Sequence, residues 1–208
     1  MKKILALLFA VLFVQTAYAQ FRIEAGGAVG SFENGYFFIF RSSSDVSAAF
    51  GFDANVSYNI HLNSNEKNSG LSIAPGVGYL MNNVRIKGKN AKMRTQWIQV
   101  PVNLVVDIPI GVNDIGFTAS AGLYYGYALN GKIIDPAGEL NGVEYINAPT
   151  GERLLKRHDF GLNAKVGMMF TKNIGFYIGY SRGFLDISDV QGYIARTYTT
   201  RFGFILSL

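Results

Sequence analysis

The chain has 208 residues, of which 49% are hydrophobic and 16% charged, and its formal net charge is +5. It contains no cysteine, which excludes disulfides, thiol catalysis and cysteine-ligated zinc. The modest basic excess follows no stripe of stacking aromatics, so nucleic-acid binding has little support. Its 24 glycines, 12 tyrosines and 16 phenylalanines favour strands over helices.

The first 19 residues have the pattern of an export signal. Lys2 and Lys3 precede an apolar run from Ile4 to Val14, and Ala17-Tyr18-Ala19 fits a small-x-small cleavage site. The alternative is a transmembrane helix, but eleven apolar residues are too few, because such a helix needs about 20. We therefore expect residues 1–19 to be a signal peptide and residues 20–208 to form one domain.

The remainder alternates apolar residues with small or polar ones, and a period of two indicates strands with two chemically different faces. The clearest example runs from Phe117 to Tyr127. Each segment with this pattern is long enough to cross a membrane at a tilt. In chain order the predicted strands are Phe21 to Phe32, Phe50 to His61, Leu71 to Leu80, Arg94 to Asp107, Ile115 to Leu129, His158 to Phe170, Ile174 to Phe184 and Arg196 to Leu208.

The connections between these strands alternate in length. Exported barrels have short periplasmic turns and longer outer loops. Here the longer connections are Glu33 to Ala49, Met81 to Met93, Asn130 to Arg157 and Leu185 to Ala195, and the shorter ones are Leu62 to Gly70, Ile108 to Asp114 and Thr171 to Asn173. We therefore predict an all-β fold, an eight-stranded antiparallel transmembrane β-barrel of up-and-down topology in the bacterial outer membrane, with both termini in the periplasm.

A soluble eight-stranded barrel, such as a lipocalin, would have charged residues outside and apolar residues inside. In the segment from Asp159 to Phe170, one face is entirely apolar and the other contains Asp159, Asn163, Lys165, Met169 and glycines. A face so rich in glycine suits a barrel interior better than a solvated surface.

Aromatic residues also fall into two predicted interfacial bands. The predicted bands are Phe50, Tyr125, Tyr127, Phe160, Phe184 and Tyr198 near the outer rim, and Phe21, Tyr58, Phe117 and Phe170 near the periplasmic rim.

The alternation predicts which polar side chains face the lumen. An eight-stranded barrel has room inside for side chains but not for a water channel, and buried charges persist only when paired. We therefore predict a plug in which Glu24 and Asp53 meet Lys165 and Arg201; a proton or ion relay is the alternative. The predicted lumen residues are Arg22, Glu24, Asp53, Asn55, Asn59, His61, Gln99, Asn103, Asp107, Asn163, Lys165 and Arg201.

Four segments resemble the PorT-like family of outer-membrane β-barrel proteins. They are WIQVPVNLVVDI (Trp97 to Ile108), ASAGLYYGY (Ala119 to Tyr127), HDFGLNAKVGMMF (His158 to Phe170) and FYIGYSRGFLDIS (Phe176 to Ser188). The likeness extends over essentially the whole mature chain. It implies an outer-membrane barrel without a family-wide catalytic site.

Catalysis has weak support in the residues themselves. A lipid A hydrolase is the enzymatic alternative, with His158, Asp159 and either Ser181 or Ser188 as its components. Adjacent residues of a strand face opposite sides, however, so Asp159 is poorly placed to orient His158. Asp186 and Asp189 make an incomplete metal site. We expect no enzyme activity, no cofactor and no metal.

Specific activity, if present, belongs to the outer loops. The basic run Arg85, Lys87, Lys89, Lys92 and Arg94 is a candidate for contact with lipopolysaccharide phosphates, although an ordinary solvated loop is the favoured interpretation. In the longest loop, Asp135-Pro136-Ala137-Gly138 predicts the turn of a protruding hairpin. We expect a monomer in contact with the bilayer and lipopolysaccharide, with a structural or surface-interaction role and a protein partner reached through these loops. An accessory role in a secretion or assembly machine is a further alternative.

Overall fold

The computed structural model describes residues 19–33, 46–64, 70–86, 91–110, 115–135, 138–141, 155–188 and 195–208. The signal peptide predicted for residues 1–19 lies almost entirely outside this part of the chain. Within the described ranges the chain forms nine strands: β1 (Ala19–Glu33), β2 (Val46–Ser64), β3 (Gly70–Ile86), β4 (Ala91–Pro109), β5 (Gly116–Asp135), β6 (Gly138–Asn141), β7 (His158–Met169), β8 (Ile174–Gly183) and β9 (Arg196–Ser207).

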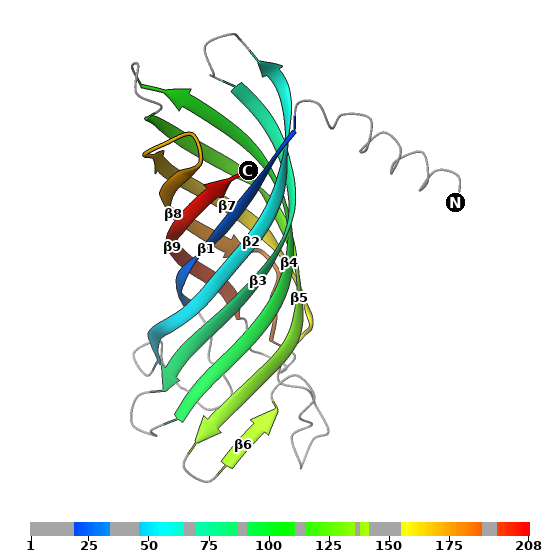
Figure 1. The fold of residues 1–208 in the computed structure, drawn as a ribbon. Helices are drawn as coiled ribbons and strands as arrows, with labels where there is room; N and C mark the ends of the chain where they lie inside the picture. Colours follow the sequence, from blue (N-terminus) through cyan, green and yellow to red (C-terminus); the bar gives the residue numbers. More distant parts are fainter. Residues whose placement is uncertain are drawn as a thin grey trace, which may run out of the picture.

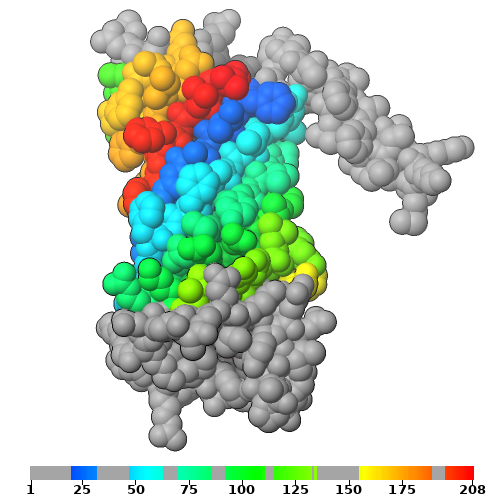
Figure 2. Space-filling model, turned by 60° about the horizontal axis from the view of Figure 1, so that its bottom comes forward, coloured from blue at the N-terminus to red at the C-terminus, as the bar shows by residue number. Residues whose placement is uncertain are grey.

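Eight of the strands close into an antiparallel barrel. Strands that follow one another along the chain pair with each other, β5 pairs with β7, and β1 pairs with β9 to complete the circle. Figure 1 shows the tilted strands of this barrel, and in Figure 2 the red surface of β9 lies beside the blue surface of β1. Closure leaves no open edge in the described barrel wall. A sheet that spans a membrane needs such closure, because unpaired backbone N–H and C=O groups have no hydrogen-bond partners in hydrocarbon. The predicted eight-stranded barrel is confirmed.

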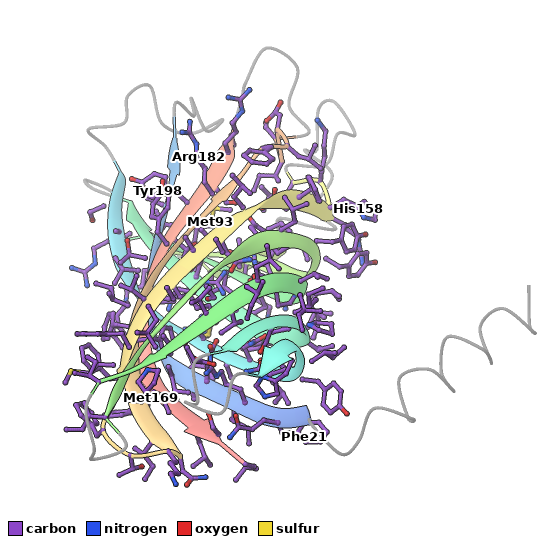
Figure 3. All side chains as sticks on the ribbon, turned by 90° about the horizontal axis from the view of Figure 1, so that it is seen from above. Phe21, Met93, His158, Met169, Arg182 and Tyr198 are labelled. Atoms are coloured by element: carbon purple, nitrogen blue, oxygen red, sulfur yellow. The ribbon has the colours of Figure 1, made fainter. Side chains whose placement is uncertain are left out.

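Strand β6 lies outside the circle, and among the described strands it pairs only with the end of β5, where Asp135 is opposite Gly138. The predicted protruding hairpin is therefore confirmed. We call the end of the barrel that carries β6 the outer end, following the predicted orientation, and the end where β1 begins and β9 ends the inner end (Figure 1). In Figure 3, Arg182 and Tyr198 lie toward the outer end, whereas Phe21 and Met169 lie toward the inner end.

The two faces of the barrel have reversed polarity relative to a water-soluble protein. Burial alternates residue by residue along β7 and β8. Val166 and Phe204 on the outside are 58% and 70% exposed, whereas Lys165 on the inside is 8% exposed. This reversal is the property that distinguishes a membrane barrel from a lipocalin-like one.

The outward apolar residues form a band of uniform height on β3, β4 and β5. The band runs from Leu71 to Met81 on β3, from Ile98 to Ile108 on β4, and from Phe117 to Tyr127 on β5. Each segment advances ten residues, or about 33 Å of strand. At a tilt of about 40° this gives a height of about 25 Å, which is the usual height of the apolar band of outer-membrane barrels.

The strands are longer at the outer end than the sequence predicted. The connections expected at Met81 to Met93 and from Asn130 onward were wrong in part, because β3 continues to Ile86 and β5 to Asp135. These extensions contain polar residues and so lack the apolar alternation that marks the spanning segments. Backbone pairing with a neighbouring strand is enough to continue a strand into water.

A β-bulge interrupts the pairing of β4 with β5. Trp97 pairs with Ala128 and Gln96 with Asn130, so that Leu129 has no partner in β4. A single extra residue reverses the inside–outside alternation of a strand beyond it. Beyond the bulge, Lys132 therefore pairs with Arg94. Without the bulge, its even number would place it on the lumen face of β5, together with Tyr124.

The lumen is filled along its length. Met169, Tyr177 and Ile205 form a buried apolar cluster at the inner side, and Leu80, Val84, Met93 and Trp97 are buried toward the outer end. Between the strands β1 and β9, Gly26 lies opposite Gly203, and a Cβ atom at Gly26 would lie 2.0 Å from the backbone oxygen of Phe202. Glycine at this position therefore allows the two closing strands to approach each other closely.

Candidate functional site

The first of two ion pairs in the lumen joins β1 to β7. Lys165 Nζ contacts Glu24 Oε2, and Asn55 Nδ2 from β2 donates a hydrogen bond of 3.4 Å to the same oxygen. The ammonium group also lies 5.3 Å from the centre of the Tyr177 ring. The Lys165 ammonium group is thus held between a carboxylate and an aromatic face.

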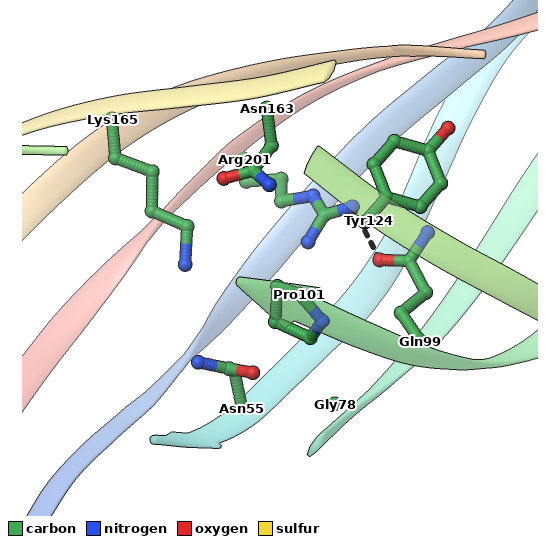
Figure 4. A pocket seen from close by; sticks show the side chains of 8 residues that line it. All are labelled: Asn55, Gly78, Gln99, Pro101, Tyr124, Asn163, Lys165 and Arg201. Atoms are coloured by element: carbon green, nitrogen blue, oxygen red, sulfur yellow. Dashed lines mark hydrogen bonds between the residues drawn. The ribbon is translucent and has the colours of Figure 1, made fainter. Parts of the chain in front are cut away.

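The second ion pair joins β2 to β9. Arg201 Nη1 lies 3.0 Å from Asp53 Oδ1, and Tyr177 Oη donates a hydrogen bond of 2.9 Å to Asp53 Oδ2. Arg201 Nη2 donates to Gln99 Oε1 at 2.7 Å, the dashed line in Figure 4, and to Ser181 Oγ at 3.1 Å. Both carboxylate oxygens of Asp53 are therefore occupied, and Asp53 is 1% exposed.

Tyr177 connects the two pairs, since its hydroxyl group contacts Asp53 while its ring faces Lys165. We call Glu24, Asp53, Lys165 and Arg201 the lumen network. Its members and their direct partners come from β1, β2, β4, β7, β8 and β9. The network therefore ties together strands that are not neighbours in the sheet and lies across the interior of the barrel.

A small cavity borders this network. Its lining residues are Asn55, Gly78, Gln99, Pro101, Tyr124, Asn163, Lys165 and Arg201 (Figure 4). Asn55 Oδ1, both amide atoms of Asn163 and Arg201 Nε are buried and have no hydrogen-bond partner among the described residues. The cavity has room for about one water molecule, which these polar atoms suit. It is too small for a permeating solute.

Two further polar groups occupy the lumen nearer its ends. Toward the inner end, Arg22 Nη2 lies 3.0 Å from Asp107 Oδ1, and Arg22 Nη1 donates a hydrogen bond of 3.1 Å to Thr118 Oγ1. Toward the outer end, Tyr124 and Thr197 donate to Asp159 Oδ2 at 2.9 and 2.7 Å. The sequence analysis predicted that Arg22 and Asp107 face the lumen. It did not predict the hydrogen-bonded group of Tyr124, Thr197 and Asp159.

The other predicted lumen residues are distributed as follows. Asn59 and Asn103 are buried. His61 is only half-buried, and its Nδ1 lies 2.8 Å from Ser72 Oγ. The lumen therefore has a polar interior along its length, with its partly exposed members at the inner end.

The residues of the hypothetical hydrolase are not assembled. His158 is on the outside of the barrel, where its Nδ1 lies 2.5 Å from Tyr125 Oη and its ring packs against Tyr127 (Figure 3). Asp159 and Ser181 are buried in the lumen, on the opposite side of the strand wall. Ser188 is buried near Asp186, whose Oδ1 accepts backbone hydrogen bonds from Ser188 and Ala195.

The described ranges contain no group of three or more histidine, aspartate or glutamate side chains able to hold a metal ion. Asp189, the other residue considered for a cation site, lies outside these ranges. No described helix is long and apolar enough to cross a bilayer.

Three members of the basic run lie on strands rather than in a loop. Arg85 is near the end of β3, and Lys92 and Arg94 are near the start of β4; all three are exposed. Lys87 and Lys89 lie outside the described residues. Sequence reasoning missed Lys132, because the β-bulge at Leu129 that places it beside Arg94 has no signal in the alternation.

The closed barrel, its apolar outer face and its filled polar lumen define a transmembrane β-barrel. A family model described as outer membrane protein beta-barrel domain matches residues 13–189. The chain therefore belongs to this family, and it is a protein of the bacterial outer membrane.

Comparison with solved structures found chains with low sequence identity. Neisserial surface protein A is 14% identical with a TM-score of 0.49, over 90% of this chain and 96% of that chain. Ail, the attachment invasion locus protein of Yersinia pestis, is 11% identical with a TM-score of 0.45, over 91% and 99%. The outer membrane enzyme PagL is 11% identical with a TM-score of 0.47, over 88% and 98%. No curated protein matches the sequence.

Proposed function

We propose that this protein is a monomeric, non-catalytic outer-membrane barrel with a plugged lumen, and that it acts as a structural or surface-interaction component of the envelope. The observation that carries the proposal is the lumen network. Glu24 with Lys165 and Asp53 with Arg201 join strands from different parts of the wall. Buried apolar residues and two further polar groups lie on either side of the network.

Conduction requires sites that an ion can both enter and leave. In this lumen the charged groups already bind one another, and both oxygens of Asp53 have partners. A permeating ion would have to displace a fixed ion pair in a space with room for about one water molecule. These contacts support a plug rather than an ion or proton pathway.

Single-channel recording of the folded protein in planar bilayers tests the plug. We expect no stable, large conductance steps from the wild-type protein. The matched control is the double variant Glu24→Ala/Lys165→Ala, which removes one complete pair without leaving a lone charge and should conduct more often than wild type. Heat-modifiable migration on a gel shows that both proteins are folded. Stable, large steps from the wild-type protein would refute the plug.

The enzymatic alternative is a lipid A hydrolase. The outward position of His158 and the inward positions of Asp159 and Ser181 argue against it. The lipid A mass spectrum of a strain that lacks the protein should match that of wild type. A change that His158→Ala reproduces would establish the hydrolase in place of the proposed role.

We infer membership of the PorT-like family from the four segments that resemble it, which contribute strands β4, β5, β7 and β8. An accessory role in a secretion or assembly machine is the second candidate function, reached through the outer ends of the strands. Pull-down from detergent extracts separates the two: a stoichiometric, reproducible envelope partner would favour the accessory role, and its absence the structural one.

A further inference from the structure

Basic side chains face one another across three adjacent strands at the outer end. In the strand register Arg85 is opposite Lys92, and Arg94 is opposite Lys132. We call these four residues the outer basic cluster. Like charges directly opposite each other in a sheet are destabilising. The pairing of Arg85 with Lys92 therefore does not by itself stabilise the fold.

The lumen cations contact carboxylates, whereas the exposed cations of the outer basic cluster contact none in the described part of the chain. Arg85, Lys92 and Arg94 are exposed, and none of the residues that the structure describes supplies a carboxylate partner for them. Three exposed positive charges that lack a carboxylate from the described barrel wall favour binding of an external anion.

The height of the cluster identifies the layer in which that anion lies. The outward apolar band ends at Ile98 on β4 and at Tyr127 on β5, and Arg94 lies four residues beyond Ile98. Four residues are about 13 Å of strand, or about 10 Å of height at the usual tilt. Headgroups occupy roughly 5–8 Å beyond each edge of the hydrocarbon. The long side chain of Arg94 can reach back toward the membrane and into this headgroup layer.

Arg94 is held in place by its neighbours. Its Nε donates a hydrogen bond of 3.2 Å to Asn83 Oδ1, and Asn83 Nδ2 donates one of 2.7 Å to the backbone oxygen of Phe50. The guanidinium group is thus fixed to the wall through Nε, which leaves its two terminal nitrogens for a ligand. Such a group binds phosphate oxygens in a bidentate manner.

From these observations we propose that the outer basic cluster binds the phosphate groups of outer-leaflet lipopolysaccharide. The cluster would also attract free phosphate, but its position directly above the apolar band favours a phosphate attached to acyl chains that lie against that band. This proposal deepens the surface-interaction role and rests on it for its biological meaning. It names the ligand class and adds Lys132 and Asn83 to the residues that the sequence suggested.

The test titrates fluorescent bisphosphorylated lipid A, and its dephosphorylated form, against the folded full-length mature protein in detergent micelles. The variant is Arg85→Gln/Lys92→Gln/Arg94→Gln, and the matched control is Lys172→Gln, an exposed lysine in the turn at the inner end. We expect the triple variant to bind bisphosphorylated lipid A about tenfold or more weakly, which corresponds to about 1.4 kcal/mol. The control should bind like wild type, and the dephosphorylated form should bind all three proteins equally.

A second variant, Asn83→Ala, keeps every positive charge but removes the group that positions Arg94, and should weaken binding by a smaller factor. Equal binding of bisphosphorylated lipid A by wild type and the triple variant would overturn the proposal, as would an equal loss in Lys172→Gln. Effective competition by inorganic phosphate at concentrations comparable to that of the lipid would also overturn it in favour of a free-phosphate site. Conductance and pull-down test the proposed function separately, because neither depends on lipid affinity.

Discussion

The lumen and the outer rim use the same basic residue types in opposite ways. Inside, Lys165 contacts Glu24 and Arg201 contacts Asp53, and each pair has further hydrogen-bond or aromatic partners. At the rim, Arg85 faces Lys92 and Arg94 faces Lys132 across the strands. Burial explains the difference, because a buried charge must be neutralised by the protein itself, whereas an exposed one is stabilised by solvent or by a ligand. The lumen charges are neutralised by the protein itself, whereas Arg85, Lys92 and Arg94 at the rim are exposed and have no carboxylate partner among the described residues.

The most direct test of this difference removes one arginine from each region. Arg201→Ala leaves Asp53 buried without its cation and should lower the free energy of unfolding by about 3–5 kcal/mol. Arg94→Ala should change it by less than about 0.5 kcal/mol, since Arg94 is exposed. Urea titration in lipid vesicles, followed by tryptophan fluorescence of Trp97, measures both. Similar losses at the two positions would show that the lumen pairs contribute no more than the rim does.

A second test places a charge on the wrong face of a single strand. Val166→Arg puts a guanidinium group into hydrocarbon and should lower the free energy of unfolding by about 2–4 kcal/mol. The neighbouring change Lys165→Arg keeps a cation inside, next to Glu24, and should be tolerated better. The same urea titration gives the order of the two losses. Equal losses would mean that the inward and outward faces of β7 have been misassigned.

The smallest effect is expected beyond the rim. Deletion of residues 133–152 removes β6 and the last part of β5, but leaves the apolar band of β5 and its pairing with β4 and β7. The deleted protein should still show heat-modifiable migration and resist urea like wild type. Loss of folding would show that this extension is part of the barrel's stability rather than an attachment to it.

The alternation of residues was sufficient to predict the barrel and the inward positions of Lys165 and Arg201. It did not determine the course of the lumen contacts, because Tyr177 and Gln99 meet the network only when tilted strands bring distant residues to one level. Nor did it find the outer extensions of β3 and β5, where polar residues on both faces remove the periodic signal. Trp97 in the lumen was missed as well, since a large aromatic residue is more often expected in an interfacial band.

The unpartnered residue in β5 has an evolutionary consequence. Leu129 shifts the phase of the strand by one, and Lys132 lies beyond it. Loss of this one codon, with no amino-acid replacement anywhere, would exchange the two sides of the strand tip and redirect a cation from the lipid side toward the interior. In a wall built on strict alternation, insertions and deletions are therefore a route to a new surface chemistry that point substitutions would reach only through several steps.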